Sequence, residues 1–187
     1  MISGPGGVGK DTIISRLLEL DPRLRYSVSF TTRPRRDYEV DGKHYTFVSP
    51  LEFRRLVLEG EFLEHAIVNG HLYGTSATRV DKLQDAGHDV ILKIDVHGAE
   101  NVRRRRPDGV FIFIAPPSME ELLRRRIARG SDPEADIDAR QRLAEIEMGF
   151  ADRYDYVVVN DDADRAVVEI EGIIERQRRL REIGGRR

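Results

Sequence analysis

Seven residues near the start of the chain decide its fold class: Gly4-Pro5-Gly6-Gly7-Val8-Gly9-Lys10. They match the G-x-x-x-x-G-K core of a phosphate loop, in which glycines let backbone N–H groups turn inward around a phosphate and the lysine neutralises its oxygens. Apolar Met1–Ser3 predicts a strand before the loop, and helical spacing predicts a helix over Thr12–Leu20 after it. A glycine-rich turn that only caps a helix is the alternative, but strand, loop and helix in this order favour phosphate binding. Because only three residues precede Gly4, we expect the sequence to begin inside the strand, and whether the true N-terminus lies upstream of Met1 is left open.

The motif departs from its usual form directly after the lysine. A Ser or Thr normally follows and ligates Mg²⁺, but here Asp11 stands in that place and Thr12 comes next. Thr12 could supply the hydroxyl, or Mg²⁺ could accept the Asp11 carboxylate directly or through water. We favour an Asp11 that points to solvent, because the start of a helix stabilises a carboxylate without any metal contact.

The rest of the chain alternates apolar strands with helices. Strands are expected at Asp89–Asp95, Val110–Ile114 and Tyr156–Val159, with helices before and after each. Continuous apolar strands separated by helices predict an α/β fold, a P-loop three-layer sandwich with a parallel core sheet. Short strands predict an antiparallel insertion at residues 30–75, and a polar break after Arg129 predicts a helical lid at 124–142. The core of this single domain is then 1–29, 76–123 and 143–187.

Composition narrows the function classes. The 187 residues carry 31 Lys+Arg against 33 Asp+Glu, a net charge of −2 that does not suggest nucleic-acid or membrane partners. The absence of Cys excludes disulfides and thiolate chemistry. No apolar run approaches 18 residues and no leader is visible, so we expect a cytoplasmic location. The sequence does not indicate any protein partner.

Two groups of arginines are candidates for phosphate binding. The first lies in Ser27–Arg36, followed by Asp41–Tyr45; forked guanidinium donors spread well over phosphate oxygens, although a solvated basic loop is an equal alternative for this run alone. The second runs along 124–142, where Arg124 is expected on a solvated helix face and Arg142 fits such a face and the site equally well. Phosphoryl transfer relies on positioned cations around the moving charge, which such arginines would supply.

The chain resembles the guanylate kinases across nearly its whole length. The resemblance rests on Ser-x-Ser-x-Thr-Thr-Arg at 27–33, Val-Asp-Gly-x-x-Tyr-x-Phe at 40–47, Gly-Glu-Phe-Leu-Glu at 60–64 and Tyr-Gly-Thr at 73–75. It continues through Ile94–Ala99, Phe113–Ser118, Arg129-Gly130 and Val158–Asp161, in family order and at family spacing. This agreement is much more specific than the phosphate loop alone.

The resemblance implies ATP and GMP as substrates, Mg²⁺ as cofactor, and a role for each matching residue. The residues expected to bind ATP are Gly4, Pro5, Gly6, Gly7, Val8, Gly9, Lys10, Asp11, Thr12, Arg125, Arg129 and Asn160. The residues expected to bind GMP are Arg33, Arg36, Tyr45 and Tyr73 at its phosphate, Ser29, Glu64, Thr75 and Asp95 at its guanine, and Arg140. The catalytic residues implied are Lys10, Arg125, Arg129 and Arg140.

Elementary chemistry agrees with the guanine assignment. Guanine presents N1–H and N2–H donors beside an O6 acceptor, so a carboxylate and a hydroxyl complement it, whereas adenine would leave the carboxylate without donors. Taken alone, Glu64 and Asp95 could equally be a surface carboxylate and a turn former at a strand end. No general base is needed, because an acceptor phosphate oxygen is already ionised.

Three departures from the family pattern bear on the site. Lys93 replaces an acid two residues before Asp95, which with Asp11 suggests an exchange of charges near the phosphates. Arg126 stands where the family usually has an apolar residue, so which of Arg125 and Arg126 faces the site is open. A guanylate-kinase-like module that binds proteins without catalysis is the alternative function, disfavoured by the intact Lys10 and lid arginines. A kinase for another nucleoside monophosphate is disfavoured by Glu64 and Asp95.

Overall fold

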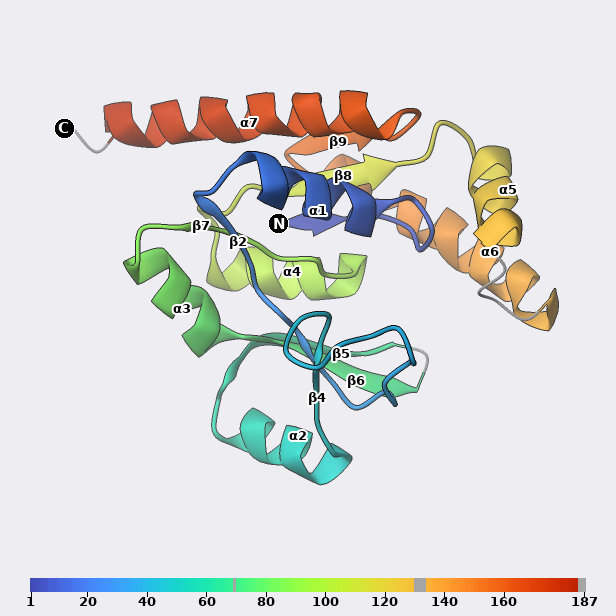
Figure 1. Cartoon of the computed structure of the whole chain (residues 1–187), viewed down its shortest axis with the longest axis horizontal. Coiled ribbons are helices and arrows are strands. Elements are labelled where there is room, and N and C mark those ends of the chain that lie inside the picture. Colours follow the sequence, from blue (N-terminus) through green and yellow to red (C-terminus); the bar gives the residue numbers. More distant parts are fainter. Residues whose placement is uncertain (69, 130–133, 185–187) are drawn as a thin grey trace. The chain divides into compact units, whose positions relative to one another are not determined.

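The computed structural model describes residues 1–68, 70–129 and 134–184. The chain divides into two compact units: unit 1 joins Met1–Asp21 to Val110–Arg187, and unit 2 is Pro22–Gly109. Figure 1 labels their helices and strands. Among the described residues, no helix combines the length and the apolar character that crossing a membrane would require.

Unit 1 is built on a parallel sheet of order β1-β8-β9. Its strands are β1 (Ile2–Ser3), β8 (Ile112–Ala115) and β9 (Tyr156–Val159), and its helices are α1 (Lys10–Leu20), α5 (Met119–Arg129), α6 (Glu134–Met148) and α7 (Ala163–Gly184), with a 3₁₀ turn at Ala151–Arg153. The central strand β8 is buried along its whole length, as its apolar sequence predicts. The parallel α/β core is thereby confirmed.

Helix α1, which follows the phosphate loop, is anchored to α7. Its buried face consists of Ile13, Ile14 and Leu17. Arg178 of α7 forms an ion pair with Asp21 at 2.5 Å, and both side chains are largely buried. Figure 1 shows α7 running beside α1. The helix that begins at the loop is therefore fixed by packing and by charge at its far end.

Unit 2 contains two small sheets. A parallel pair joins β2 (Leu24–Tyr26) to β7 (Asp89–Ile91), and a four-stranded sheet has the order β4-β3-β6-β5. The latter consists of β3 (Phe30–Thr31), β4 (Thr46–Phe47), β5 (Phe62–Val68) and β6 (His71–Ser76), and the helices are α2 (Pro50–Leu58), α3 (Ala77–Asp85) and α4 (Val96–Arg105). The pairs β3–β6 and β5–β6 are antiparallel as expected, but β3–β4 is parallel. The long connection between β3 and β4 permits this, because a parallel pair needs a crossover where a hairpin would not suffice.

Three phenylalanines form the core beneath this sheet. Phe53 stacks on Phe62 at 4.5 Å between ring centroids, and Phe30 meets Phe62 edge-on at 5.5 Å. A Cβ at Gly74 would lie 2.8 Å from two ring atoms of Phe62, so β6 has room there only for glycine. Side chains alternate along a strand, so Tyr73 and Thr75, on either side of Gly74, both point away from these rings.

Candidate active site

The phosphate loop connects β1 to α1 in unit 1. Gly4 has a φ of 141°, and a Cβ there would lie 2.2 Å from the carbonyl oxygen of Ile114 in β8. A glycine is thus required where the loop leaves the sheet. The Nζ of Lys10 donates hydrogen bonds to the carbonyls of Gly4 at 2.5 Å and Pro5 at 3.0 Å, so the ammonium lies over its own loop.

Asp11 and Thr12 are both exposed in the first turn of α1. Their carboxylate and hydroxyl oxygens are the kinds of ligand that Mg²⁺ prefers, so the residues present fit this ion. The exposure of both side chains does not separate the two alternatives, and the outward Asp11 stays a prediction.

Helix α5 and the end of β9 contribute three more side chains in unit 1. Arg125 donates from one terminal nitrogen to the carbonyl of Asn160 at 2.9 Å. Asn160 is buried, and its side-chain amide donates to the carbonyl of Val8 in the loop at 2.7 Å. Arg126 is also buried and reaches the carbonyl of Gly6. Arg126 therefore lies against the loop itself, while Arg125 lies against the segment that follows β9.

The remaining lid arginines are less defined. Arg140 of α6 is half-buried. The side chain of Arg129 lies outside the described part of the structure, so its expected role stays a prediction, as does the lid boundary at 124–142.

In unit 2, strands β5 and β6 place Glu64 directly opposite Thr75. The Thr75 hydroxyl, 1% exposed, donates to a carboxylate oxygen of Glu64, 7% exposed, at 2.7 Å. The other carboxylate oxygen lies above the first turn of α4, where a Cβ at Gly98 would be 2.8 Å away. Ser29 is buried at the start of β3 and holds β4 through its backbone carbonyl, which accepts from Thr46.

A second carboxylate influences the charge of Glu64. Burial raises the pKa of Glu64 to about 7; the Thr75 hydrogen bond opposes this rise and the charge of Asp95 adds to it. Asp95 caps α4, accepting from the backbone N–H groups of His97 at 2.8 Å and Gly98 at 2.9 Å. Two neighbouring carboxylates, one of them buried, favour a ligand that brings N–H donors.

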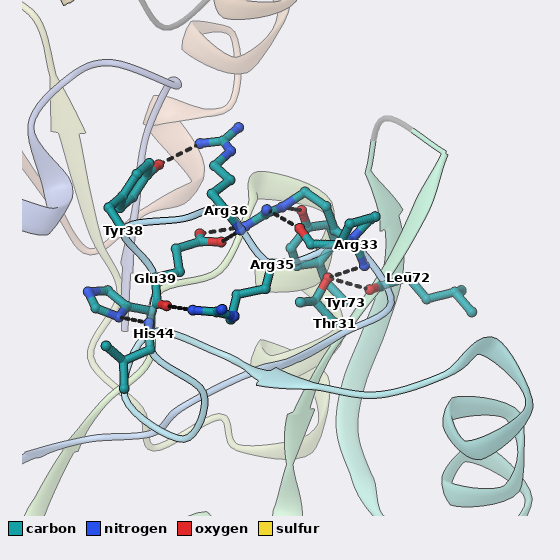
Figure 2. A network of polar contacts seen from close by, with 11 residues as sticks. Thr31, Arg33, Arg35, Arg36, Tyr38, Glu39, His44, Leu72 and Tyr73 are labelled. Carbon is teal, nitrogen blue, oxygen red and sulfur yellow. Dashed lines mark hydrogen bonds and ion pairs between the residues drawn. The ribbon is translucent and has the colours of Figure 1, made fainter.

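The phosphate-binding side chains expected in unit 2 come from β6 and from the loop between β3 and β4. Figure 2 labels three of them, Arg33, Arg36 and Tyr73. The Arg33 guanidinium donates to the Tyr73 hydroxyl at 3.2 Å and lies 5.6 Å from the centre of the Tyr45 ring. The two tyrosine rings meet edge-on at 5.8 Å. The structure thus brings together three of the four predicted residues. The Arg36 guanidinium instead donates to the Tyr38 hydroxyl at 2.8 Å on the exposed side of the loop.

Glu39 was not predicted and is central to this network, as Figure 2 shows. It is 4% exposed and accepts from Arg33 at 2.6 Å and from the backbone N–H of Arg36 at 2.8 Å. Burial alone would raise the pKa of Glu39, but these bonds outweigh it and hold the pKa below its usual range. In the sequence Glu39 is one acid in a charged loop, and nothing in its spacing signals burial.

Lys93 also lies near Tyr45 in unit 2. Its ammonium lies 5.4 Å from the centre of the Tyr45 ring, and the Arg33 guanidinium lies 5.6 Å from the same centre. The lysine that replaces the family's usual acid is therefore placed beside Tyr45. Its suggested exchange of charge with Asp11 stays a prediction.

Comparisons with known proteins agree on one family. The family model described as "Guanylate kinase" matches residues 1–177. A protein named "Guanylate kinase" from Caldanaerobacter subterraneus subsp. tengcongensis is 49% identical over 174 residues, which cover 93% of this chain and 84% of that protein. Its namesake from Thermotoga maritima is 44% identical, covering 95% of this chain and 86% of that protein. The crystal structure of guanylate kinase from Anaplasma phagocytophilum superposes with a TM-score of 0.78 at 37% identity, covering 94% of this chain and 83% of that one.

Proposed function

The chain belongs to the guanylate kinase family, and we propose that it transfers the γ-phosphoryl group of ATP to GMP or dGMP by a Mg²⁺-assisted in-line reaction. As a member of this family it is an ATP:GMP phosphotransferase. The observation that carries the substrate assignment is the buried Glu64–Thr75 pair beside Asp95, in a chain that also has a phosphate loop. The cytoplasmic location and the lack of nucleic-acid or membrane partners stay predictions from the sequence.

Unit 1 supplies the ATP half of the reaction in this proposal. Backbone N–H groups of the loop surround the β-phosphate, and Lys10 moves from its own loop carbonyls to the β- and γ-oxygens. Thr12 or Asp11 would hold Mg²⁺, and the bound ion would neutralise charge on the phosphates of ATP. Arg125 and Asn160 line the same end of the sheet, and Asn160 is also expected near the base.

Unit 2 supplies the GMP half. The Glu64 and Asp95 carboxylates accept the N1–H and N2–H of guanine, and a hydroxyl of Ser29 or Thr75 faces O6. Arg33, Tyr45, Tyr73 and Arg36 hold the phosphate, which requires the exposed Arg36 side chain to turn from Tyr38. None of these contacts involves the ribose 2′-hydroxyl, which is why dGMP is expected to react as well.

The transfer itself needs no base. An ionised oxygen of the GMP phosphate attacks the γ-phosphorus, a new P–O bond forms, and the bond to the β–γ bridging oxygen breaks. That oxygen leaves with the electron pair as part of ADP, so no proton has to move. Lys10, Arg125, Arg129 and Arg140 are proposed to stabilise the charge that shifts toward ADP.

A coupled assay with ATP, Mg²⁺ and a panel of acceptors tests this proposal. GMP and dGMP should be phosphorylated, and AMP, CMP and UMP should react far more slowly. Equal rates with AMP would contradict the role of Glu64. Binding of GMP without any turnover would instead support the alternative of a non-catalytic binding module.

A further inference from the structure

Four backbone carbonyls of the phosphate loop accept hydrogen bonds from side chains. Lys10 binds the carbonyls of Gly4 and Pro5, Arg126 binds that of Gly6, and Asn160 binds that of Val8. Arg126 and Asn160 are more than 100 positions away in the sequence, at 120 and 152 residues from their partners. Two other elements of unit 1, α5 and the end of β9, therefore hold the loop through its backbone carbonyls.

The contact of Arg126 determines the direction of one peptide group. The bond between Gly6 and Gly7 is trans, and in a trans peptide the C=O and N–H point in opposite directions. A Gly6 carbonyl fixed toward Arg126 therefore aims the Gly7 N–H to the other side of the loop. Successive N–H groups turned to one side are what make such a loop an anion site.

The fit between Arg126 and the loop is close. Its Nε at 2.9 Å and one terminal nitrogen at 2.6 Å both donate to the single Gly6 oxygen, and Arg126 is 6% exposed. Gly7 has a φ of 87°, and a Cβ there would lie 3.0 Å from Cγ and 3.2 Å from Nε of Arg126. Gly7 thus has both the backbone freedom and the space that this contact requires. Charge-assisted bonds of this kind are stronger than neutral ones.

We propose that Arg126 is a positioning residue for the triphosphate: it locks the Gly6–Gly7 peptide with its N–H turned away from α5 and places a buried positive charge behind the loop. The inference rests on the proposed function only in that the loop binds the phosphates of ATP. A purely structural role, in which Arg126 packs α5 against the loop, makes a different prediction. If Arg126 only packs α5 against the loop, its loss should weaken the binding of phosphate ligands and of other ligands of the enzyme to the same extent.

The test compares Arg126→Met, Arg126→Lys and the control Arg104→Met in the full chain. Arg104 is exposed on α4 and donates to Asn101, so its replacement makes the same change in net charge without removing a hydrogen bond to the loop. The measurements are the Kd of inorganic tripolyphosphate by calorimetry, the KM values for ATP and GMP, and the thermal midpoint.

Arg126→Met should raise the tripolyphosphate Kd and the ATP KM about tenfold, the loss expected for a charge-assisted hydrogen bond. The GMP KM should stay within about twofold, and Arg126→Lys should recover most of the affinity, since it keeps the charge.

An unchanged tripolyphosphate Kd in Arg126→Met, or equal rises in the KM values for ATP and GMP, would overturn the proposal. If Arg126→Met does not fold, Arg126→Gln takes its place, and a lysine variant no tighter than the glutamine variant would likewise overturn it. The proposed function fails separately. A wild-type chain that binds tripolyphosphate but does not phosphorylate GMP contradicts the kinase assignment and leaves the Arg126 comparison intact.

Discussion

At the residue scale, a buried ion pair orients the arginine on which the GMP phosphate is expected to bind. Glu39 holds one end of the Arg33 fork and the backbone of Arg36, while Tyr73 accepts from the Nε of Arg33. An arginine fixed in this way loses little side-chain freedom when a phosphate arrives. Removing its carboxylate partner should therefore weaken the binding of GMP more than it slows phosphoryl transfer.

The variant Glu39→Gln should raise the KM for GMP by about tenfold, the equivalent of about 1.4 kcal/mol, with kcat changed much less. The amide keeps the shape of the side chain and removes the charge that holds Arg33. Steady-state kinetics at saturating ATP measure both constants. Glu59→Gln is a matched control, because Glu59 forms an exposed ion pair with Arg55 in the same unit. A GMP KM that changes equally in both variants would show that Glu39 does not position Arg33.

A second prediction follows from the pKa of Glu64, which burial raises from 4.5 to about 7. The folded chain binds this proton more tightly than the unfolded chain, so its contribution to stability is fully present below about pH 4.5 and is lost as pH rises through about 7. The loss should be roughly 3 kcal/mol. Urea unfolding of wild type and Glu64→Gln at pH 4.5 and pH 8 measures it. The glutamine variant should lack this loss. An equal change in the free energy of unfolding between the two pH values in both proteins would count against a Glu64 that is buried and protonated.

At the element scale, Gly74 joins the aromatic core of unit 2 to the binding face of β6. Gly74→Ala would press a methyl group into Phe62 and Phe53, and overpacking of this kind costs about 1–3 kcal/mol. Because Tyr73 and Thr75 flank this position, the KM for GMP should also rise. Denaturant unfolding and kinetics measure the two effects. Gly172→Ala, at an exposed position of α7 with nothing near its added carbon, should instead stabilise the chain by about 0.5–1 kcal/mol.

Helix starts and apolar strands could be predicted from the sequence, because they depend on residues that are close together in the chain. The capping Ser49 binds the N–H of Glu52, and Ser118 binds that of Glu121, both as their spacing predicts. Residue types alone predict a single strand over Tyr26–Thr32, and this prediction is wrong because the chain changes sheets there: Leu24–Tyr26 pairs with β7 and Phe30–Thr31 with β4 and β6. Such a change depends on partners far along the chain, and no local pattern reports it.

The same distinction applies to the site. Glu64 and Thr75 belong to short motifs, and the structure pairs them. Lys93 and the inward Arg126 act through partners that are distant in the sequence, in the case of Arg126 by 120 residues. Glu39 binds Arg33 and Arg36 nearby in the sequence, but its burial depends on the fold around it. Residue type and spacing therefore indicated which groups could bind the substrates. They did not indicate which groups hold those residues in place.

At the scale of the whole molecule, the two units of the chain are proposed to carry complementary halves of a phosphoryl transfer. The resemblance assigns the lid arginines to the transferring phosphoryl group. Arg129→Ala should lower kcat by about 10²-fold, since arginines that meet the transferring phosphoryl group act mainly in the transition state. Single-turnover and steady-state kinetics separate this from binding. A rise in KM with kcat unchanged would make Arg129 a binding residue.

In the proposed function, the phosphate loop serves an acceptor site built for guanine. A competition experiment tests this specificity: equimolar GMP and AMP are mixed with limiting ATP, Mg²⁺ and the wild-type chain, and the products are followed by ³¹P NMR. A site whose buried carboxylate needs N–H donors should favour GMP by at least about 10³-fold in kcat/KM, so GDP should form while AMP stays unreacted. Consumption of AMP at a rate comparable to that of GMP would contradict the assignment of this site to guanine.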